Sequence, residues 1–490
     1  MEFLDVLEQT RTQLEYLAEH HTFSNDLLIR YPCVHTQQPH ELLHLALVQD
    51  DDTYQLAPRS PITIVFRQST DEVLFYTHKS LNRTSQCIVR NMPGHIMALL
   101  EGLLQDPHNA IHIPHILTEH EKHTIHNRNQ TDRLYPLHKP IHQIIEHQTT
   151  RTPQRISVQY QETTLTYTAF NQLANRLAHT LIEKITGQTY QHGHNAMIAI
   201  CLPRSLNLPV VIHGIFKSGA AYVPIATDSP EARLQKIIEN VEAPVVITTP
   251  ELYEEYSYLH TYKGEVILIT DNWHETLSPQ TQNPDVPLSE THLTYAIHTS
   301  GSTGEPKGVL CTHRGLCNRI LWMQDQISLS KNDTVLQKTP YAFDVSVWEF
   351  TWPFIKGARP LMCEPEMHKD PEYLANIIEQ EKVSTLHFVP SMLTTFLKAP
   401  HVAQKCMHLK RILCSGEALP LKLRNTCLQL LPHILLANLY GPTEASIDVT
   451  YWDCTQNTHP ALVPIGNTIA NMKIYILDKF LNPVPIGCAG

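Results

Sequence analysis

Beyond residue 138, short apolar runs alternate with stretches in which apolar residues recur every three or four positions. The runs AMIAICL, AYVPI and APVVIT predict buried strands, and the segments between them predict helices. Further strand and helix units follow, among them STLHFVPSMLTTFL and KRILCSGEALPLKLRNTCLQLL. Alternation of this kind indicates βαβ units around largely parallel sheets, which is an α/β fold.

The first part of the chain has a different pattern. Residues 3–20 have helical periodicity, ITIVF and EVLFYTH predict neighbouring strands, and residues 84–104 predict a second amphipathic helix. A polar, aperiodic stretch, EKHTIHNRNQTDRLYPLHK, follows and is typical of a linker. We therefore predict an α+β piece over residues 1–119, a linker over 120–137 and an α/β domain over 138–490.

Composition excludes several classes of function. The 490 residues are 42% hydrophobic and 17% charged, which is ordinary for a globular protein. A net charge of −11 gives no basic footprint for nucleic acid, and no apolar run is long enough to span a membrane. The start, MEFLDVLEQTR, is unlike a signal peptide, and the 11 cysteines form no C-x-x-C pair. We expect a cytoplasmic protein with reduced thiols that binds neither nucleic acid nor membrane.

The segment LTYAIHTSGSTGEPKG, residues 293–308, combines a strand with a loop rich in glycine and hydroxyl groups. Glycines let backbone N–H groups converge on a polyphosphate, the hydroxyl groups add donors, and Lys307 adds a positive charge. Pro306 stands where a Walker loop has a glycine before its lysine, which excludes a P-loop ATPase. A flexible surface loop is the alternative interpretation. The candidate phosphate-binding residues are Thr299, Ser300, Gly301, Ser302, Thr303, Gly304 and Lys307.

Two acidic residues carry the next signals. The run NLYGPTE, residues 438–444, follows a predicted strand, and α/β sheets bind ligands at the carboxyl ends of their strands. Glu444 ends this run, which taken alone would be a plain turn. Asp344 lies on an apolar element, where a carboxylate is costly unless it has a cationic partner. The alternative for Asp344 is a helix cap for SVWEF.

Together these motifs resemble the adenylate-forming superfamily, whose fold is of the acyl-CoA synthetase/luciferase-like type. The chain is similar to an adenylation domain of a non-ribosomal peptide synthetase preceded by the end of a condensation domain, and the resemblance covers nearly all of it. The N-terminal piece has no His-His-x-x-x-Asp-Gly motif, so we expect no condensation chemistry. The resemblance implies stacked, mixed, largely parallel sheets with flanking helices, in a large subdomain truncated before its end and lacking the small C-terminal subdomain.

The resemblance implies that an amino acid is activated with ATP and Mg²⁺ to give an aminoacyl-AMP and pyrophosphate. The acyl group would then pass to a phosphopantetheine thiol on a peptidyl carrier domain, among other synthetase modules. Asn438 and Tyr440 fall at adenine contacts, Thr443 at a phosphate contact and Glu444 at the Mg²⁺ ligand, whereas Asp344 falls where the substrate ammonium binds. The other expected nucleotide contacts are Gly416, Glu417 and Gly441, and the expected catalytic residues are Lys307, Thr303 and Glu444.

The substrate pocket is carried over in the same way. Trp348 fills volume and makes the pocket shallow, whereas His387, Ser415 and Asp448 can bond a small polar group. The set is similar to the family's serine-selecting pocket, with threonine as the alternative. The implied pocket residues are Asp344, Val345, Trp348, His387, Leu413, Ser415, Leu439, Ile447 and Asp448.

Two rival functions are open at this point. An acyl-CoA synthetase of the same fold would have an apolar residue in place of Asp344. A non-catalytic remnant would bind nucleotide or serine without turnover. The resemblance places a substrate-carboxylate lysine, a ribose-binding aspartate and a mobile domain with an assisting lysine beyond Gly490. We therefore expect these 490 residues alone to adenylate serine poorly or not at all.

Overall fold

The computed structural model describes residues 3–20, 45–49, 62–67, 72–77, 83–108, 116–186, 196–300, 306–456 and 461–489. The chain divides into two compact units, one of residues 1–130 with 473–490 and one of residues 131–472. Residues 473–490, which the sequence assigns to the domain 138–490, thus fall in the first unit. None of the helices in the described ranges combines the length and apolar character needed to cross a membrane.

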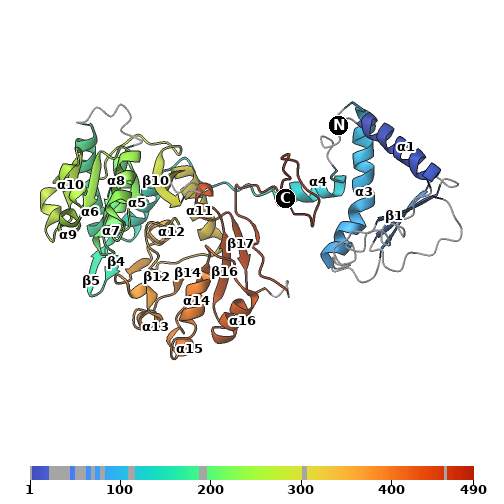
Figure 1. The fold of residues 1–490 in the computed structure, drawn as a ribbon. Coiled ribbons are helices and arrows are strands. Elements are labelled where there is room, and N and C mark those ends of the chain that lie inside the picture. The colour runs from blue at the N-terminus through green and yellow to red at the C-terminus, as the bar shows by residue number, and fades with distance from the viewer. Residues whose placement is uncertain are drawn as a thin grey trace. The chain divides into compact units, whose positions relative to one another are not determined.

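The first unit contains two long helices and a small sheet. Strands β1 and β2 are parallel, and β2 and β3 are antiparallel neighbours. The two helices and the neighbouring β2 and β3 confirm the elements predicted from the sequence. Their bounds are α1 Phe3–His20, β1 Leu45–Gln49, β2 Ile62–Arg67, β3 Glu72–Thr77 and α3 Arg83–Gln105 (Figure 1).

A further helix, α4 (Glu119–Arg128), lies where the sequence suggested an aperiodic linker. Its first turn has a capping box, because the Glu121 N–H donates to Thr118 Oγ1 (3.3 Å) and the Thr118 N–H donates to Glu121 Oε2 (3.1 Å). The buried Glu121 carboxylate also pairs with His95 Nε2 (2.7 Å) and accepts from the Ile486 N–H (3.1 Å). One carboxylate therefore joins α3, α4 and the segment 473–490.

The unit 131–472 contains two sheets. The six-stranded sheet has the order β11-β10-β7-β6-β8-β9, and all neighbours are parallel except β10 and β11. Its strands are β6 Met197–Cys201, β7 Ala221–Pro224, β8 Val245–Thr248, β9 Glu265–Leu268, β10 Leu293–Ser300 and β11 Pro306–Thr312.

The nine-stranded sheet has the order β18-β17-β16-β15-β14-β12-β13-β4-β5, with parallel pairing from β16 to β4 and antiparallel pairing at both edges. Its strands are β4 Ile156–Tyr160, β5 Thr163–Thr166, β12 Thr334–Gln337, β13 Arg359–Met362, β14 Thr385–Phe388, β15 Arg411–Cys414, β16 Leu435–Tyr440, β17 Thr450–Asp453 and β18 Asn467–Thr468.

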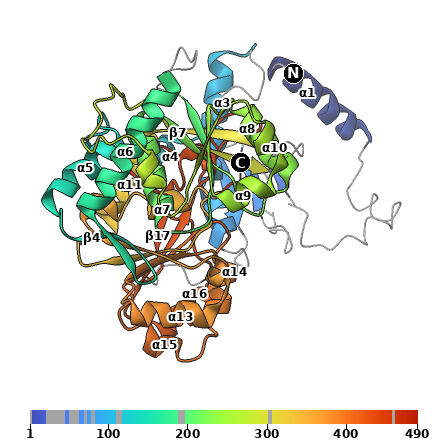
Figure 2. The ribbon, with the colours of Figure 1, turned by 90° about the vertical axis from the view of Figure 1, so that its left-hand side faces the viewer.

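The helices of this unit form layers on the faces of the sheets. Successive residues of a strand point to opposite faces of the sheet and so belong to different hydrophobic clusters. On strand β12, Leu336 belongs to the cluster that includes α13 to α16, and Val335 belongs to the cluster that includes α5, α6, α7 and α11. Helices α8 and α10 cover the other face of the six-stranded sheet. In Figures 1 and 2 helices α13 to α16 gather on one side of the nine-stranded sheet. The helices are α5 Ile141–Arg151, α6 Tyr167–Thr186, α7 Asn207–Ser218, α8 Glu231–Asn240, α9 Pro250–Glu255, α10 Ser257–Thr261, α11 His313–Gln326, α12 Ser346–Glu349, α13 Pro371–Gln380, α14 Pro390–Phe396, α15 Val402–Lys405 and α16 Leu421–Leu430.

Short 3-10 turns complete the fold, and hydrogen bonds join the two ends of the unit. The Asn471 N–H donates to the Thr131 carbonyl (2.9 Å), and the Arg133 N–H donates to Asn471 Oδ1 (2.8 Å). Thr131 Oγ1 also donates to the Met472 carbonyl (2.6 Å). The 3-10 turns are η3 Trp273–Thr276, η4 Phe354–Lys356, η5 Met367–Lys369 and η6 Thr443–Ala445.

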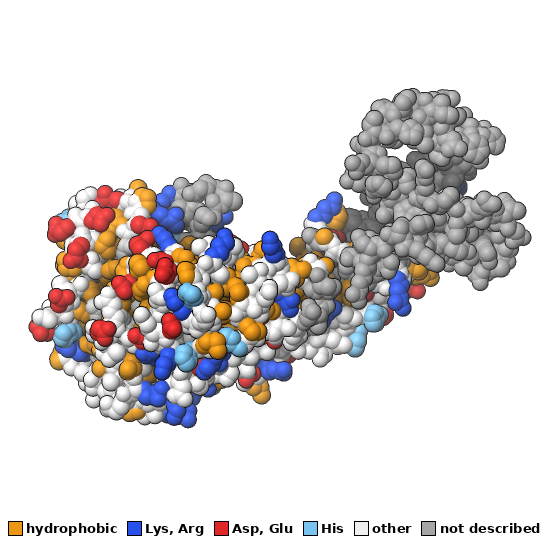
Figure 3. Space-filling model, turned by 90° about the horizontal axis from the view of Figure 1, so that it is seen from below, with side chains coloured by type: hydrophobic (Ala, Val, Ile, Leu, Met, Phe, Trp, Pro, Cys, Tyr) orange, Lys and Arg blue, Asp and Glu red, His pale blue; other side chains and the backbone are white. Residues whose placement is uncertain are grey.

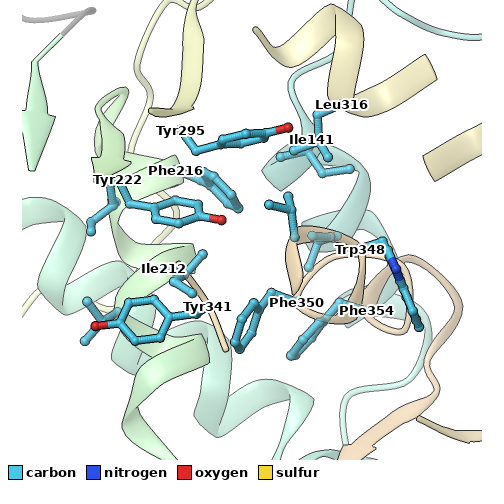
Figure 4. Close-up of a cluster of buried hydrophobic side chains, with 14 of the residues drawn as sticks. Ile141, Ile212, Phe216, Tyr222, Tyr295, Leu316, Tyr341, Trp348, Phe350 and Phe354 are labelled. Atoms are coloured by element: carbon cyan, nitrogen blue, oxygen red, sulfur yellow. The ribbon is translucent and has the colours of Figure 1, made fainter. Parts of the chain in front are cut away.

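A buried aromatic cluster lies between the two sheets. Figure 4 shows Phe216, Tyr222 and Tyr295 together with Trp348 and Phe354. These side chains come from α7, β7, β10, α12 and η4. The cluster therefore supports both the strand that precedes the predicted phosphate loop and the helix that carries Trp348.

Candidate functional site

The predicted phosphate-binding segment includes parts of two strands, β10 and β11. Strands β10 and β11 pair antiparallel, with Thr299 opposite Lys307 and Ser300 opposite Pro306. The sequence placed Thr299, Ser300 and Lys307 in the loop, but the structure places them in the strands, because cross-strand pairing satisfies their backbone groups. The Lys307 side chain is exposed. The predicted residues Gly301, Ser302, Thr303 and Gly304 lie outside the described residues.

The loop between β16 and β17 folds back tightly on itself. A Cβ atom on Gly441 would lie 2.5 Å from Cα of Asp448, so only glycine fits this close approach. Ser446 and Ile447 both have left-handed backbone conformations, with φ of 64° and 80°. Such a conformation is unusual for a β-branched residue and is found where function or packing demands it. The loop therefore places Ile447 and Asp448 at fixed positions.

The two predicted nucleotide motifs meet at β11. The Cys311 thiol on β11 donates to the Thr443 carbonyl of η6 at 3.7 Å and is hydrogen-bonded to the Ser446 side chain. Glu444, in the same turn, is exposed. Two motifs that are far apart in the sequence thus lie side by side.

Asp344 lies next to this turn. Its carboxylate accepts hydrogen bonds from the Thr443 side chain and the Val345 N–H. Burial raises the pKa of Asp344 to about 6, the neighbouring Asp448 adds to the rise, and the bond from Thr443 opposes it. Helix α12 begins at Ser346 with Val345 as its N-cap residue and no side-chain cap, so the helix-cap interpretation of Asp344 is wrong. Val345 itself is half-buried.

The inner pocket residues are buried. His387 Nε2 and Ser415 Oγ are 3.0 Å apart, at the carboxyl ends of the neighbouring strands β14 and β15. Burial lowers the pKa of His387 well below its ordinary value, as does the charge of Lys338, so the ring is neutral at pH 7 and offers one donor and one acceptor. Trp348 is fully buried, and its Nε1 has no hydrogen-bond partner within the described structure. Leu413, Leu439 and Ile447 belong to the same hydrophobic cluster as Trp348.

Asp448 has a partner that the sequence analysis missed. Arg319 Nη2 donates to Asp448 Oδ2 at 2.8 Å, and both side chains are buried. Burial raises the pKa of Asp448, and the Arg319 guanidinium opposes the rise. Arg319 lies among Leu316, Ile320 and Met323 on the apolar face of α11. A single charge at this position of an apolar stripe is the signal that could have identified it.

Two predicted nucleotide contacts already have protein partners. Asn438 Nδ2 donates to the Pro464 carbonyl at 2.8 Å. The Glu417 carboxylate accepts from the Ser391 N–H (2.9 Å) and hydroxyl (3.0 Å). The turn before Glu417 depends on Gly416, whose φ of 85° favours glycine.

Other predicted nucleotide-site residues are open to solvent. Tyr440 is 51% exposed, and the side chains of Lys307 and Glu444 are exposed as well. No group of three or more His, Cys, Asp or Glu side chains suited to a metal ion occurs among the described residues. A single accessible carboxylate fits Mg²⁺, which keeps several waters and binds through one or two carboxylates plus substrate phosphates.

Comparisons with known proteins decide the family. The family model described as AMP-binding enzyme matches residues 145–490. The chain belongs to the AMP-binding enzyme family. Among its relatives in that family, it is 34% identical to tyrocidine synthase 3 of Brevibacillus parabrevis over 93% of its own length and 7% of the relative's. It is 42% identical to enterobactin synthase component F of Escherichia coli (strain K12) over 60% of its own length and 23% of the relative's.

The fold of this AMP-binding enzyme is also that of solved peptide synthetases. The AMPPNP-bound structure of the non-ribosomal peptide synthetase FmoA3 superposes with a TM-score of 0.79 and 22% identity, covering 90% of this chain and 48% of that one. The likeness confirms the predicted α/β adenylate-forming fold with mixed, mostly parallel sheets. The chain spans less than a quarter of tyrocidine synthase 3 and of enterobactin synthase component F.

Proposed function

We propose that the chain is the amino-acid-activating region of a non-ribosomal peptide synthetase and that it forms seryl-AMP and pyrophosphate from serine, ATP and Mg²⁺. The observation that carries the proposal is the Asp344 carboxylate bonded to Thr443 beside the nucleotide motifs. Half-buried carboxylates need a cationic partner, and the α-ammonium group of an amino acid supplies one. An acyl-CoA synthetase substrate has no such cation, so this contact favours an amino acid.

The side-chain pocket favours serine. Trp348, Leu413, Leu439 and Ile447 leave little room for a large side chain, since all four are buried in one cluster. The hydrogen-bonded His387 and Ser415 provide polar atoms for a hydroxyl group. A pocket built to bond a hydroxyl group rejects analogues that lack it much more strongly than an apolar pocket sorts methylene groups. Threonine carries the same hydroxyl group with one extra methyl group and is the second candidate.

Lys307 and Glu444 would hold the triphosphate and Mg²⁺. Both side chains are exposed, on the adjacent β11 and η6. The metal ion, when bound, supplies charge stabilisation for the phosphates. Tyr440 offers an exposed aromatic surface for adenine.

The reaction asks the protein to position two substrates. A serine carboxylate oxygen attacks the α-phosphorus of ATP, the new O–P bond forms, and the bond to pyrophosphate breaks. The protein supplies no nucleophile, so orientation and charge stabilisation account for the rate. Asp344 fixes the ammonium end, and Lys307 fixes the phosphates.

The setting of this activity is also part of the proposal. We place residues 1–119 as the end of a condensation domain, 120–137 as a linker and 138–490 as an adenylation subdomain. A carrier domain with phosphopantetheine and other synthetase modules would receive the seryl group. A complex of FmoA3 with α-methyl-L-serine-AMP is a structural neighbour at 22% identity, which speaks for the fold alone. Serine is therefore proposed from the pocket residues.

Amino-acid-dependent exchange of pyrophosphate into ATP tests the function across the standard amino acids. The chain is compared with an extended version that also carries the C-terminal subdomain of a related synthetase, because the resemblance implies that this subdomain assists adenylation. In the extended version serine should stand clear of threonine and alanine. D344N should lower serine-dependent exchange by about 100-fold or more, the loss expected when a partly buried ion pair is broken. D325N is the control, since Asp325 is an exposed carboxylate bonded to Tyr135.

The outcomes separate the alternatives. Preference for another amino acid would keep the reaction class and overturn the pocket assignment. Exchange in response to no amino acid would favour a remnant that binds without turnover. Equal exchange by the 490-residue chain and the extended version would contradict the expected need for that subdomain.

A further inference from the structure

Arg319 is an arginine buried in an apolar layer. It lies on α11 with Leu316 and Ile320, and its side chain is 1% exposed. Its guanidinium carbon is 5.0 Å from the ring centroid of Trp322. Removing a guanidinium from water is costly, and arginine is almost never fully buried unless it is paired.

The pairing of Arg319 is incomplete. Only Nη2 bonds to Asp448, through Oδ2 at 2.8 Å, whereas Nε and Nη1 are buried and have no partner within the described structure. A guanidinium offers five N–H donors and commonly binds a carboxylate through two of them. Buried ion pairs contribute little net stability, and apolar replacements are often neutral or stabilising. An ion pair held by a single hydrogen bond is therefore not explained by its contribution to stability alone, because that contribution is small.

The position of Asp448 suggests that the ion pair serves substrate binding. Asp448 follows Ile447, which shares a cluster with Trp348 and Leu439. It is also close enough to Asp344 for the two charges to interact. Two neighbouring carboxylates in a buried place cannot both ionise easily, so one tends to take up a proton. A guanidinium on Asp448 relieves that repulsion while Asp344 remains free for an ammonium group.

The bond between Arg319 and Asp448 uses one carboxylate oxygen. Oδ1 of Asp448 takes no part in it and keeps its capacity as an acceptor. We propose, on the basis of the serine-activating function proposed above, that Arg319 is a positioning residue for substrate specificity. Its bond to Oδ2 holds Asp448 as a carboxylate whose Oδ1 accepts a hydrogen bond from the hydroxyl group of the substrate side chain.

The test measures how this chain binds non-hydrolysable sulfamoyl analogues of seryl-AMP and alanyl-AMP, by calorimetry. The ratio of the two affinities isolates the hydroxyl contact, because the nucleotide and ammonium contacts are common to both. R319M should lower the affinity for the seryl analogue by about tenfold or more, the loss expected for one charge-assisted hydrogen bond. The affinity for the alanyl analogue should change by less than about threefold.

Three further variants separate positioning from a structural role. R319K keeps the positive charge and should retain more of the seryl preference than R319M. D448N alone should lose the preference for the seryl analogue, as R319M does. Adding D448N to R319M should change the ratio of the two affinities by less than about threefold, because the effects of coupled residues are not additive. R359M is the matched control, since Arg359 on β13 pairs with Glu381 at the end of α13 and its loss should leave the ratio unchanged.

The outcomes distinguish this role from the proposed function. If the wild-type chain prefers the seryl analogue and R319M keeps the preference, serine recognition stands and the role of Arg319 is overturned. If R319M weakens both analogues equally, the pair is structural. If the wild-type chain shows no seryl preference, serine recognition itself is wrong and the role falls with it. Should R319M fail to fold, R319K and the uncharged pair R319Q/D448N decide the same question, since the latter leaves no unpaired buried charge.

Discussion

Asp344 and Asp448 are two carboxylates with different partners. Asp344 has neutral hydrogen-bond donors, Thr443 and the Val345 N–H, and its pKa is raised to about 6. Asp448 has the Arg319 guanidinium. The carboxylate without a cation is the one that gains most from a substrate ammonium, so we expect the two residues to have separate tasks in the proposed pocket.

The raised pKa of Asp344 predicts a pH dependence of substrate binding. The ammonium contact requires the ionised carboxylate, which is lost as the pH falls through about 6. Affinity for the seryl-AMP analogue should therefore fall by about tenfold between pH 7 and pH 5, whereas AMPPNP affinity should change by less than about twofold. Burial raises the pKa values of the neighbouring Tyr222, Tyr295 and Cys311, so these groups stay neutral in that range. A flat calorimetric profile for the seryl analogue would contradict the assignment.

At the scale of elements, the loop between β16 and β17 connects the proposed nucleotide motif to the proposed substrate pocket. It begins with Gly441, includes the exposed Glu444, and ends with the buried Ile447 and Asp448. The loop can serve both ligands only if its backbone stays in the observed path. Its left-handed residues and the close approach at Gly441 are consistent with a rigid loop.

G441A should destabilise this loop. The added Cβ would lie 2.5 Å from Cα of Asp448 and 2.7 Å from the Ile447 carbonyl oxygen, which are backbone atoms that cannot move alone. We expect a loss of about 2 kcal/mol or more in the free energy of unfolding, as for other overpacked sites, together with weaker binding of the seryl analogue. Urea denaturation measures the first effect. G308A is the control, because its Cβ would meet only the His298 side chain, at 3.2 Å, so an equal loss there would refute the explanation.

The sequence predicted elements well where a buried strand leaves a continuous apolar run. The α/β order and strand β7 follow from such patterns, and the structure confirms them. The sequence did not predict elements whose structure depends on tertiary contacts. Thr299 and Lys307 were assigned to a loop because the segment is rich in glycine and hydroxyl residues, although the two residues pair across antiparallel strands. Helix α4 was assigned to a linker because its residues are polar and little of it besides Glu121 is buried. Arg319 was missed because a lone arginine in a helix ordinarily faces solvent.

At the scale of the whole molecule, the first unit has a polar anchor of its own. In the first unit, Glu121 joins α3, α4 and the segment near Ile486. In the second unit, Figure 3 shows acidic, basic and apolar side chains interspersed over the face that it presents. The proposed ligand contacts all belong to residues 131–472. A change at Glu121 should therefore affect stability without affecting ligand selection.

E121Q tests this separation. Burial raises the pKa of Glu121, but hydrogen bonds from Thr118, His95 and the Ile486 N–H outweigh it, so the pKa is lowered from 4.5. The carboxylate thus stabilises the fold above pH 4.5, and this contribution is lost as the pH falls through the lowered value. We expect E121Q to cost about 1–3 kcal/mol at pH 7, seen as faster hydrogen exchange in α4, with unchanged seryl-analogue affinity.

E119Q provides the matched comparison on the same helix. Glu119 pairs with Lys122 at the surface, and its side chain is 89% exposed. Removing such a pair should cost less than about 0.5 kcal/mol. Equal exchange rates in the two variants would show that the buried contacts of Glu121 do not anchor the unit.

The hydrogen bonds that join Thr131 and Arg133 to Asn471 have a consequence for how such chains are recombined. A segment whose two ends are held together can be replaced by a homologous segment without stretching its neighbours. Exchange points at residues 131 and 472 would transfer both nucleotide motifs, Asp344 and the Arg319–Asp448 pair as one cassette. Breakpoints between Arg319 and Asp448 would instead combine halves of a buried ion pair from different parents, and such chimaeras should inherit unmatched pockets.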